Sequence, residues 1–253
     1  MSFVPWKVRY LLRCLGNTRD LRSAARFVLR GDIPLSRTSR FRYVRQVYRI
    51  SFRVWCAHTQ DEIFQVATAA LKVPAEVPGV LVEAGCYKGG STAKLSLLAR
   101  MSGRKLIAYD SFEGLPENQE SNQRTLDGET ADFHQGAYRG GLAEVEGNIR
   151  RFGDIDVCRF VKGWFDDTMP HHREPIVAAF VDVDLASSTK SCLKWLFPKL
   201  QPGASIFSQD GHIPLVMAVL DDDDFWEGEL GRKKPPMVGL RTSKLVRIIN
   251  RPT

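Results

Sequence analysis

The segment from Gly79 to Asp110 constrains the fold of this chain more than any other part of the sequence. It opens with an apolar run at 80–82, which predicts a buried strand that ends at Glu83. A turn rich in glycine follows at once and contains Gly85, Gly89 and Gly90. Glycine lets the backbone approach a ligand closely and adopt a positive φ. A strand that leads into such a turn is typical of the ligand-binding end of an α/β unit.

A helix and a second strand complete this unit. Ser91 and Thr92 are predicted to cap the helix that follows the turn. The second apolar strand, at 106–109, ends at Asp110, 25 positions after Gly85. An acid at this place can accept hydrogen bonds from a ribose diol, while the N-terminus of the helix offers free N–H groups to an anion. The order of elements therefore predicts a nucleotide-binding unit.

The glycine pattern is not the dinucleotide motif G-x-G-x-x-G. It reads E-x-G-x-x-x-G-G-S, with the carboxylate of Glu83 two residues before the first glycine. That carboxylate would repel a diphosphate, but it would attract the ammonium group of an amino-acid-like ligand. The pattern therefore favours S-adenosylmethionine over a dinucleotide. A βαβ unit with a loose glycine turn and no such ligand is the alternative that these residues leave open.

Length and composition limit the remaining possibilities. With 253 residues, of which 43% are hydrophobic, the chain is expected to form one α/β domain with an appendage. We expect neither a transmembrane helix nor a secretory signal, because no apolar run is long enough for the first and no cleavage pattern indicates the second. Five widely spaced cysteines without metal spacing predict reduced thiols in a cytoplasmic protein.

Positive charge is concentrated at the N-terminus. Residues 1–55 contain thirteen lysines and arginines and two acids, a net charge of +11, so the rest of the chain carries −4. A helix is predicted at 18–30, and basic residues alternate with aromatic residues at 40–53. Such a segment binds nucleic acid or the surface of an anionic membrane, or else it is a helical cap whose arginines face water. We therefore divide the chain into a basic N-terminal helical extension, residues 1–58, and an α/β domain, residues 59–253.

Strands and helices alternate through the α/β domain. Helices are predicted at 59–71, 138–152 and 189–200, and further strands at 157–161, 176–181, 204–207, 237–240 and 245–249. A long polar loop at 111–135 interrupts this alternation and is expected to be functional or mobile. The alternation predicts a mostly parallel sheet with helices on both faces.

Acidic residues follow the predicted strands directly: Glu83, Asp110, Asp182, Asp184 and Asp210. Ligands bind at the carboxyl ends of the strands in an open α/β sheet, so these acids are expected at one edge. Asp182, Gln209 and Asp210 offer three hard oxygen ligands, which suit Mg²⁺ or Ca²⁺. A single acid at a strand end is also a common turn former or helix cap, and that reading stays open for each acid taken alone.

Six segments, taken in order, resemble the macrocin O-methyltransferase family, which methylates sugar hydroxyls of antibiotics and related glycosides. They lie at 82–91, 109–116, 151–153, 161–170, 182–189 and 197–203, and the whole resemblance covers roughly residues 60–225. Asp-Ser-Phe-Glu-Gly-Leu-Pro at 110–116 and Lys-Gly-Trp-Phe at 162–165 are its most specific motifs. The resemblance implies a Rossmann-like class I methyltransferase fold, with a mostly parallel seven-stranded sheet and helices on both faces.

The resemblance also implies roles for individual residues. S-adenosylmethionine would contact Glu83, Gly85, Tyr87, Gly89, Ser91, Asp110, Ser111, Phe112, Gly163, Trp164 and Asp182. Mg²⁺ would be held by Asp182, Gln209 and Asp210, with Asp184 as the general base and His212 as the second candidate base. The family usually has two consecutive aspartates where this chain has Gln209 and Asp210. A neutral ligand lowers affinity for a hard cation, so Mg²⁺ is expected to bind weakly.

The sequence indicates one main function and two alternatives. The main prediction is an S-adenosylmethionine-dependent O-methyltransferase, assisted by Mg²⁺, that acts on a sugar hydroxyl of a small-molecule glycoside, a secondary metabolite or a polysaccharide. The first alternative is a nucleic-acid methyltransferase that docks through the basic N-terminus. The second is a module that binds S-adenosylmethionine without catalysis, which Gln209 supports and the three strand-end aspartates oppose. A cytoplasmic protein, peripheral at the membrane surface and forming a homo-oligomer, is also expected.

Overall fold

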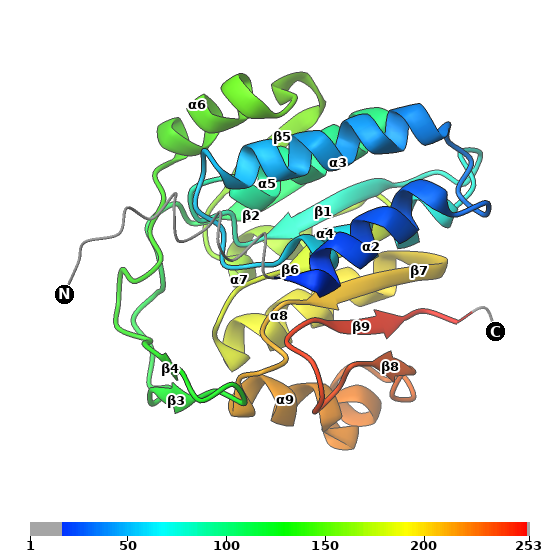
Figure 1. Cartoon of the computed structure of the whole chain (residues 1–253). Helices are drawn as coiled ribbons and strands as arrows, with labels where there is room; N and C mark the ends of the chain where they lie inside the picture. The colour runs from blue at the N-terminus through cyan, green and yellow to red at the C-terminus, as the bar shows by residue number, and fades with distance from the viewer. Residues whose placement is uncertain (1–16, 252–253) are drawn as a thin grey trace.

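A computed structural model of the chain describes residues 17–251, and a seven-stranded sheet lies at its centre (Figure 1). The order of its strands is β5-β2-β1-β6-β7-β9-β8. Five of them run parallel: β1 (Val80–Ala84), β2 (Leu106–Asp110), β5 (Cys158–Lys162), β6 (Ile176–Val181) and β7 (Leu200–Ser208). β9 (Val246–Ile249) is antiparallel to β7 and to β8 (Met237–Val238). The predicted mostly parallel sheet and its C-terminal strand pair are confirmed.

Helices cover both faces of the sheet, as predicted (Figure 1). One face carries α2 (Thr18–Leu29), α3 (Arg37–Ser51), α4 (Gln60–Lys72), α5 (Gly90–Met101) and α6 (Leu142–Phe152). The other face carries α7 (Phe165–Thr168), α8 (Ala186–Leu196) and α9 (Pro214–Asp221). Short 3₁₀ or π turns, labelled η1 (Ile155–Val157), η2 (Met169–His171), η3 (Phe197–Lys199) and η4 (Asp224–Glu229), lie between these elements. Among the helices that the structure describes, none has the length and apolar composition needed to cross a bilayer.

The N-terminal helices share a core with the sheet. The ring of Phe27 in α2 stacks on that of Phe64 in α4, with centroids 5.4 Å apart, and Tyr43 of α3 packs against both. The buried cluster around these rings extends to Leu95 of α5 and to Phe180 of β6. Burial of several aromatic side chains fixes α2 and α3 firmly on the domain. The predicted domain boundary at residue 58 stays a prediction. In the structure, α2 packs against α4 and α3 packs against α5, so the two N-terminal helices lie directly on the α/β domain.

Most predicted elements are confirmed, but some of their ends differ. The predicted helix at 189–200 begins three residues earlier, at Ala186, and gives way to a 3₁₀ turn at Phe197, because Pro198 cannot continue an α-helix. The predicted helix at 138–152 begins only at Leu142. Helix α9 was not predicted, and residues 1–16 of the predicted N-terminal extension lie outside the described residues.

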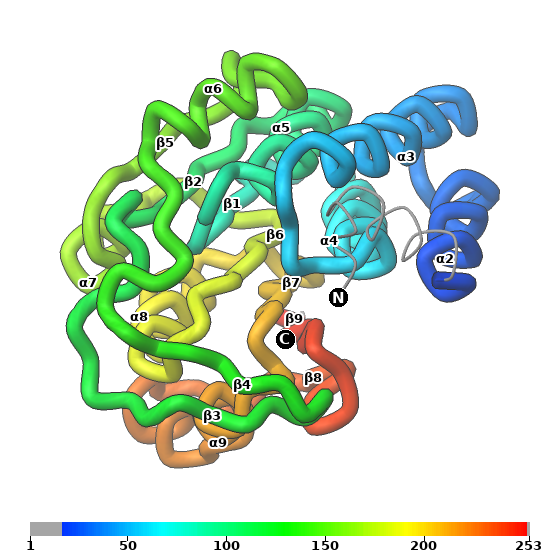
Figure 2. The backbone as a smooth tube through the Cα atoms, turned by 60° about the vertical axis from the view of Figure 1, so that its left-hand side comes forward, coloured from blue at the N-terminus to red at the C-terminus, as the bar shows by residue number. Residues whose placement is uncertain are grey.

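The long loop at 111–135 is not structureless. It contains a small antiparallel hairpin of β3 (Gln123–Arg124) and β4 (Thr130–Ala131). The loop leaves β2, passes α9 with this hairpin, and returns toward α6 (Figure 2). Backbone hydrogen bonds, such as that from the Leu126 N–H to the His212 carbonyl, hold it against the turn between β7 and α9. The loop therefore forms one wall of the space at the strand ends.

Candidate active site

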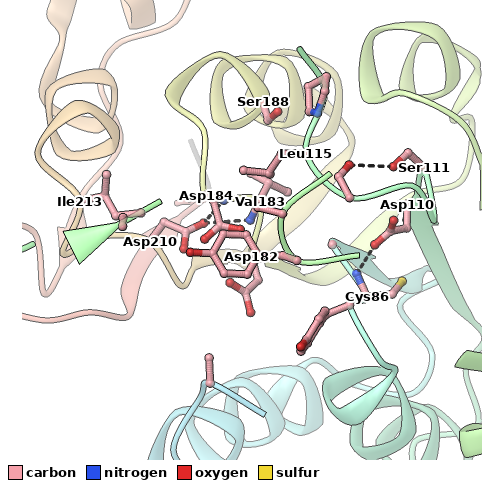
Figure 3. Close-up of a pocket in the computed structure, with 18 of the residues that line it drawn as sticks. Cys86, Asp110, Ser111, Leu115, Asp182, Val183, Asp184, Ser188, Asp210 and Ile213 are labelled. Atoms are coloured by element: carbon pink, nitrogen blue, oxygen red, sulfur yellow. Dashed lines mark hydrogen bonds between the residues drawn. The ribbon is translucent and has the colours of Figure 1, made fainter. Parts of the chain in front are cut away.

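A cavity of about 810 Å³ lies at the carboxyl ends of the parallel strands. The turn after β1, the ends of β2 and β6, the segment after β7 and the long loop line it (Figure 3). β1 pairs with β2 on one side and with β6 on the other, so the order of strands reverses direction there. A crevice at such a switch point is where open α/β sheets bind their ligands.

The turn after β1 depends on glycine for two reasons. Gly85 has φ +86, and a Cβ built on it would lie 1.9 Å from the carbonyl oxygen of Asp182. Gly89 has φ +79 and is the N-cap of α5, so the predicted caps Ser91 and Thr92 lie instead in the first turn of that helix. Tyr87 adopts φ +46 between them, a left-handed conformation that costs about 1–3 kcal/mol in a residue other than glycine. Strain of this kind marks a turn that is held in place by its surroundings.

Asp110 joins two of the turns that line the cavity (Figure 3). One carboxylate oxygen accepts a hydrogen bond from the Cys86 N–H at 2.6 Å, and the other accepts one from the Phe112 N–H at 2.6 Å. Burial raises the pKa of Asp110, while these two backbone donors oppose that increase. Each carboxylate oxygen can accept a second hydrogen bond, so Asp110 can still receive hydroxyl donors from a ligand.

Three aspartates gather at the ends of β6 and β7. Asp182, Asp184 and Asp210 each place a carboxylate oxygen within 4.8 Å of the others. One oxygen of Asp210 accepts hydrogen bonds from the N–H groups of Val183 and Asp184, at 2.8 and 2.9 Å. These bonds hold the turn after β6, in which Asp184 adopts φ +61 (Figure 3).

Burial and mutual repulsion disfavour three negative charges in this cluster. Burial raises the pKa of Asp182 and Asp184 well above the usual range, and the charge of Asp210 raises both further. Burial also raises the pKa of Asp210. Lys244, which lines the same cavity, opposes the increase at all three. The cluster therefore favours binding of a proton or a cation.

Most of the predicted site residues line this cavity. They are Gly85, Tyr87, Ser91, Asp110, Ser111, Gly163, Trp164 and Asp182 of the predicted cofactor site, Asp210 of the predicted metal site, and the two predicted bases Asp184 and His212. Gly89 and Phe112 do not line it, but they shape the turns beside Cys86 and Asp110. The geometry thus brings these residues together, while their individual roles stay predictions.

The structure places Glu83 away from the cavity, so its predicted contact with the ammonium group of a ligand stays a prediction. The side chain of Glu83 is fully buried and does not line the cavity. Side chains of a strand alternate between faces, so Glu83 points to the same side as Leu81, toward the core beneath α5. One of its oxygens has no hydrogen-bond partner, and burial raises its pKa to about 7.

The predicted metal ligand Gln209 does not line the cavity either, so its role also stays a prediction. Its side chain is fully buried, and its amide nitrogen donates to a carboxylate oxygen of Glu62 in α4 at 3.1 Å. That oxygen also accepts the Thr59 N–H as part of the capping box of α4. Because consecutive residues at a strand end point to opposite faces, Gln209 faces α4 while Asp210 faces the cavity.

Several cavity residues were not predicted because they come from distant loops. Trp55 and His58 belong to the connection between α3 and α4, and Lys244 precedes β9. Glu120 of the long loop caps α8: its carboxylate accepts from the Ala186 N–H at 2.8 Å and from the Ser187 N–H at 2.9 Å. No motif marks these residues, since only the packing of the loops brings them to the strand ends.

The strand order, the glycine turn and the acid that ends β2 together define a class I methyltransferase fold. Two solved structures share it: the O-methyltransferase NovP, with a TM-score of 0.63 and 23% identity over 83% of this chain and 89% of that chain, and the calicheamicin methyltransferase CalS11, with a TM-score of 0.57 and 16% identity over 91% of both chains. Within this class, residues 59–225 match the family model of macrocin-O-methyltransferase (TylF), so the chain belongs to that family. The resemblance inferred from the motifs is confirmed.

Curated relatives fit the same family. The chain is 34% identical over 165 residues to an 8-demethyl-8-(2,3-dimethoxy-alpha-L-rhamnosyl)-tetracenomycin-C 4'-O-methyltransferase of Streptomyces olivaceus, covering 63% of this chain and 62% of the relative. It is 33% identical over 149 residues to the mycinamicin III 3''-O-methyltransferase of Micromonospora griseorubida, covering 54% and 57%. The chain therefore spans about three fifths of the length of these relatives.

Proposed function

We propose that this protein is an S-adenosylmethionine-dependent O-methyltransferase that acts on a hydroxyl of a sugar in a glycoside. The observation that carries the proposal is the cavity in which Asp110 and the three clustered aspartates face one space. The family membership supports it, as do relatives that are named for methylation of sugar-bearing metabolites. Transfer is an in-line displacement at the sulfonium methyl, which requires the acceptor oxygen about 3 Å from that carbon.

The residues present fit S-adenosylmethionine. Asp110 has lone pairs left for the ribose hydroxyls, and Ser91 lies at the N-terminus of α5, where a carboxylate is stabilised by free N–H groups and the helix dipole. Gly163, with φ +145, and Trp164 line the cavity near the end of β5, where we place the adenine. Gly85 lets the turn after β1 pack directly on the segment after β6.

The residues present also fit Mg²⁺, with a ligand set that differs from the predicted one. Carboxylate oxygens are the donors that Mg²⁺ prefers, and no lysine or arginine among residues 17–251 makes an ion pair with the three clustered aspartates. We propose that Asp182 and Asp210 hold the ion. When bound, it would lower the pKa of the acceptor hydroxyl.

Asp184 is the proposed base. It lies in the cavity beside Asp182 and Asp210, and burial raises the pKa of its carboxyl well above the usual range, so it holds a proton more readily than an exposed aspartate does. His212 is the second candidate. Burial lowers its pKa to about 4, so its imidazole is neutral at pH 7 and able to accept a proton. The turn that Asp210 holds fixes the direction of Asp184.

Two substitutions test this proposal with one control. Asp110→Ala should weaken S-adenosylmethionine binding by about 1–3 kcal/mol in calorimetry, the range for losing a buried polar partner. Asp184→Asn should bind the cofactor normally but lose about 10²–10⁴-fold in turnover on a panel of methyl glycosides followed by mass spectrometry. Asp156→Asn, an exposed acid just before β5, is the control. Wild-type protein that binds no S-adenosylmethionine contradicts the proposal, and unchanged turnover of Asp184→Asn moves the base to His212.

We also propose a cytoplasmic location, because Cys56, Cys86, Cys158 and Cys192 are free thiols. We further propose that the basic N-terminal helices contact the surface of an anionic membrane and that the protein forms a homo-oligomer. Nucleic acid is the alternative partner for the same charge. The exposed arginines of α3 favour such a contact.

A further inference from the structure

Helix α3 exposes a row of arginines along one face. Arg37, Arg42, Arg45 and Arg49 follow the helical repeat on the solvent side, and Arg53 continues the row just beyond the end of the helix at Ser51. These five residues are called the α3 arginine face. The opposite side of α3 is buried through Tyr43, Val47 and Ile50, so the helix cannot rotate to hide the row.

Within residues 17–251, no acidic side chain pairs with this face. Residues 33–60 contain no aspartate or glutamate, and none of the five arginines makes an ion pair with another described residue. The neighbouring helix α2 differs, because Arg19 pairs with Asp61 there and Arg30, just after it, pairs with Asp32. The α3 arginine face is therefore a cationic surface whose counter-charge must come from outside the described protein.

Two exposed aromatic side chains accompany the row. Phe41 lies on the same face and is 60% exposed, and Trp55, two residues after Arg53, is 50% exposed. Large aromatic rings surrounded by arginine suit the boundary between lipid headgroups and acyl chains, where the ring is buried and the cations meet phosphate. Exposure of both rings is explained if this face meets such a boundary.

The shape of this face favours a membrane over nucleic acid. α3 packs across α5 on the outside of the molecule, and its arginines lie along the outer side of a single helix (Figure 1). Single-stranded nucleic acid is usually tracked by a positively charged groove. A nucleic-acid substrate would have to place its reacting nucleotide inside the cavity next to this face, where Asp182, Asp184 and Asp210 would repel its phosphates, whereas the headgroups of a bilayer stay outside the cavity.

We propose that the α3 arginine face docks on a membrane that contains anionic phospholipid, with Phe41 and Trp55 in the headgroup layer. Trp55 also lines the cavity, so docking brings the rim of the cavity to the membrane surface. The acceptor assigned by this geometry is a glycoside whose lipid part is embedded in the membrane. This assignment rests on the proposed function. The aspartates of the cavity would receive its sugar, while the lipid part stays in the bilayer.

Cosedimentation with vesicles tests the docking surface by itself. The full chain should bind vesicles of phosphatidylcholine with 30% phosphatidylglycerol, should not bind pure phosphatidylcholine vesicles, and should be released as salt rises to about 1 M, where charges are screened within about 3 Å. The triple variant Arg42→Gln/Arg45→Gln/Arg49→Gln should bind at least about tenfold more weakly, because each basic residue near an anionic surface contributes. The single variant Arg45→Glu, which changes one residue and not three, should also bind the anionic vesicles more weakly than the wild type.

A matched control removes the same charge elsewhere. Arg150→Gln/Arg151→Gln/Arg232→Gln changes three exposed arginines on α6 and on the segment before β8. This control should bind vesicles like the wild type. Equal loss in both triple variants, absence of binding by the wild type at low salt, or tighter binding of an RNA oligonucleotide than of the vesicles at the same salt would each overturn the proposal.

A second measurement separates this inference from the proposed function. A dodecyl glycoside in the anionic vesicles and the methyl glycoside of the same sugar in solution serve as the two acceptors. The α3 triple variant should methylate the soluble acceptor like the wild type but lose at least about tenfold on the vesicle acceptor. Equal rates of the two proteins on the vesicle acceptor overturn the membrane-borne acceptor. Failure of both proteins on every acceptor, with vesicle binding intact, contradicts the proposed function and leaves the docking surface standing.

Discussion

Glu83 provides the sharpest test of how this fold tolerates a buried acid. Its carboxyl group is fully buried in the second-last position of β1, and one of its oxygens has no hydrogen-bond partner. Burial raises its pKa from an ordinary value of 4.5 to about 7. The folded protein therefore binds this proton more tightly than the unfolded chain does.

The magnitude follows from the difference between the two pKa values. Stability contributed by the neutral carboxyl is fully present below pH 4.5, declines as pH rises toward 7, and is lost above that range. The difference corresponds to about 3 kcal/mol of unfolding free energy. Glu83→Gln removes the ionisation but keeps the shape of the side chain. The variant should therefore gain stability relative to the wild type by about 3 kcal/mol between pH 4.5 and pH 8.

Urea denaturation followed by circular dichroism at a series of pH values measures this difference. Glu76→Gln, an exposed glutamate in the loop before β1, is the control, and its difference from the wild type should stay within about 0.5 kcal/mol at every pH. A difference between Glu83→Gln and the wild type that does not change with pH would refute the reasoning. It would mean that Glu83 is ionised in the folded protein and has a partner there.

Three further predictions concern contacts that hold the site together. Gly85→Ala should unfold the protein at a lower urea concentration and abolish S-adenosylmethionine binding in calorimetry, because its Cβ would lie 1.9 Å from the Asp182 carbonyl oxygen at a φ of +86. Gln209→Asp should lower the unfolding free energy by about 1–3 kcal/mol and leave Mg²⁺ affinity unchanged, because it places a second carboxylate against the buried carboxylate of Glu62. Tighter binding of Mg²⁺ by this variant would contradict the direction in which the side chain points in the structure. Glu120→Ala should cost about 0.5–2 kcal/mol as a lost helix cap and speed hydrogen exchange in the long loop, whereas unchanged exchange would show that other contacts hold that loop.

Much of the fold could be predicted from local patterns. The apolar runs of β1, β2 and β6 appear in the sequence as short, bounded segments, and burial on both faces of a parallel sheet requires such runs. Asp110 and Asp182 could be placed at one edge because every parallel strand of an α/β sheet ends on the same side. The N-cap of α5 was misplaced because the left-handed Gly89 closes the turn without a side-chain cap.

The sequence by itself determined the seven strands of the central sheet along the chain, most of the longer helices, the edge at which the acids gather, and the family. Only the tertiary structure decided which acids face the cavity. Glu83 lies two residues before Gly85 and Gln209 stands next to Asp210, yet both side chains are fully buried, Glu83 beneath α5 and Gln209 against Glu62 of α4. Trp55, Glu120 and Lys244 reach the cavity from loops far apart in the chain, and their approach depends on long-range packing, which no local pattern encodes.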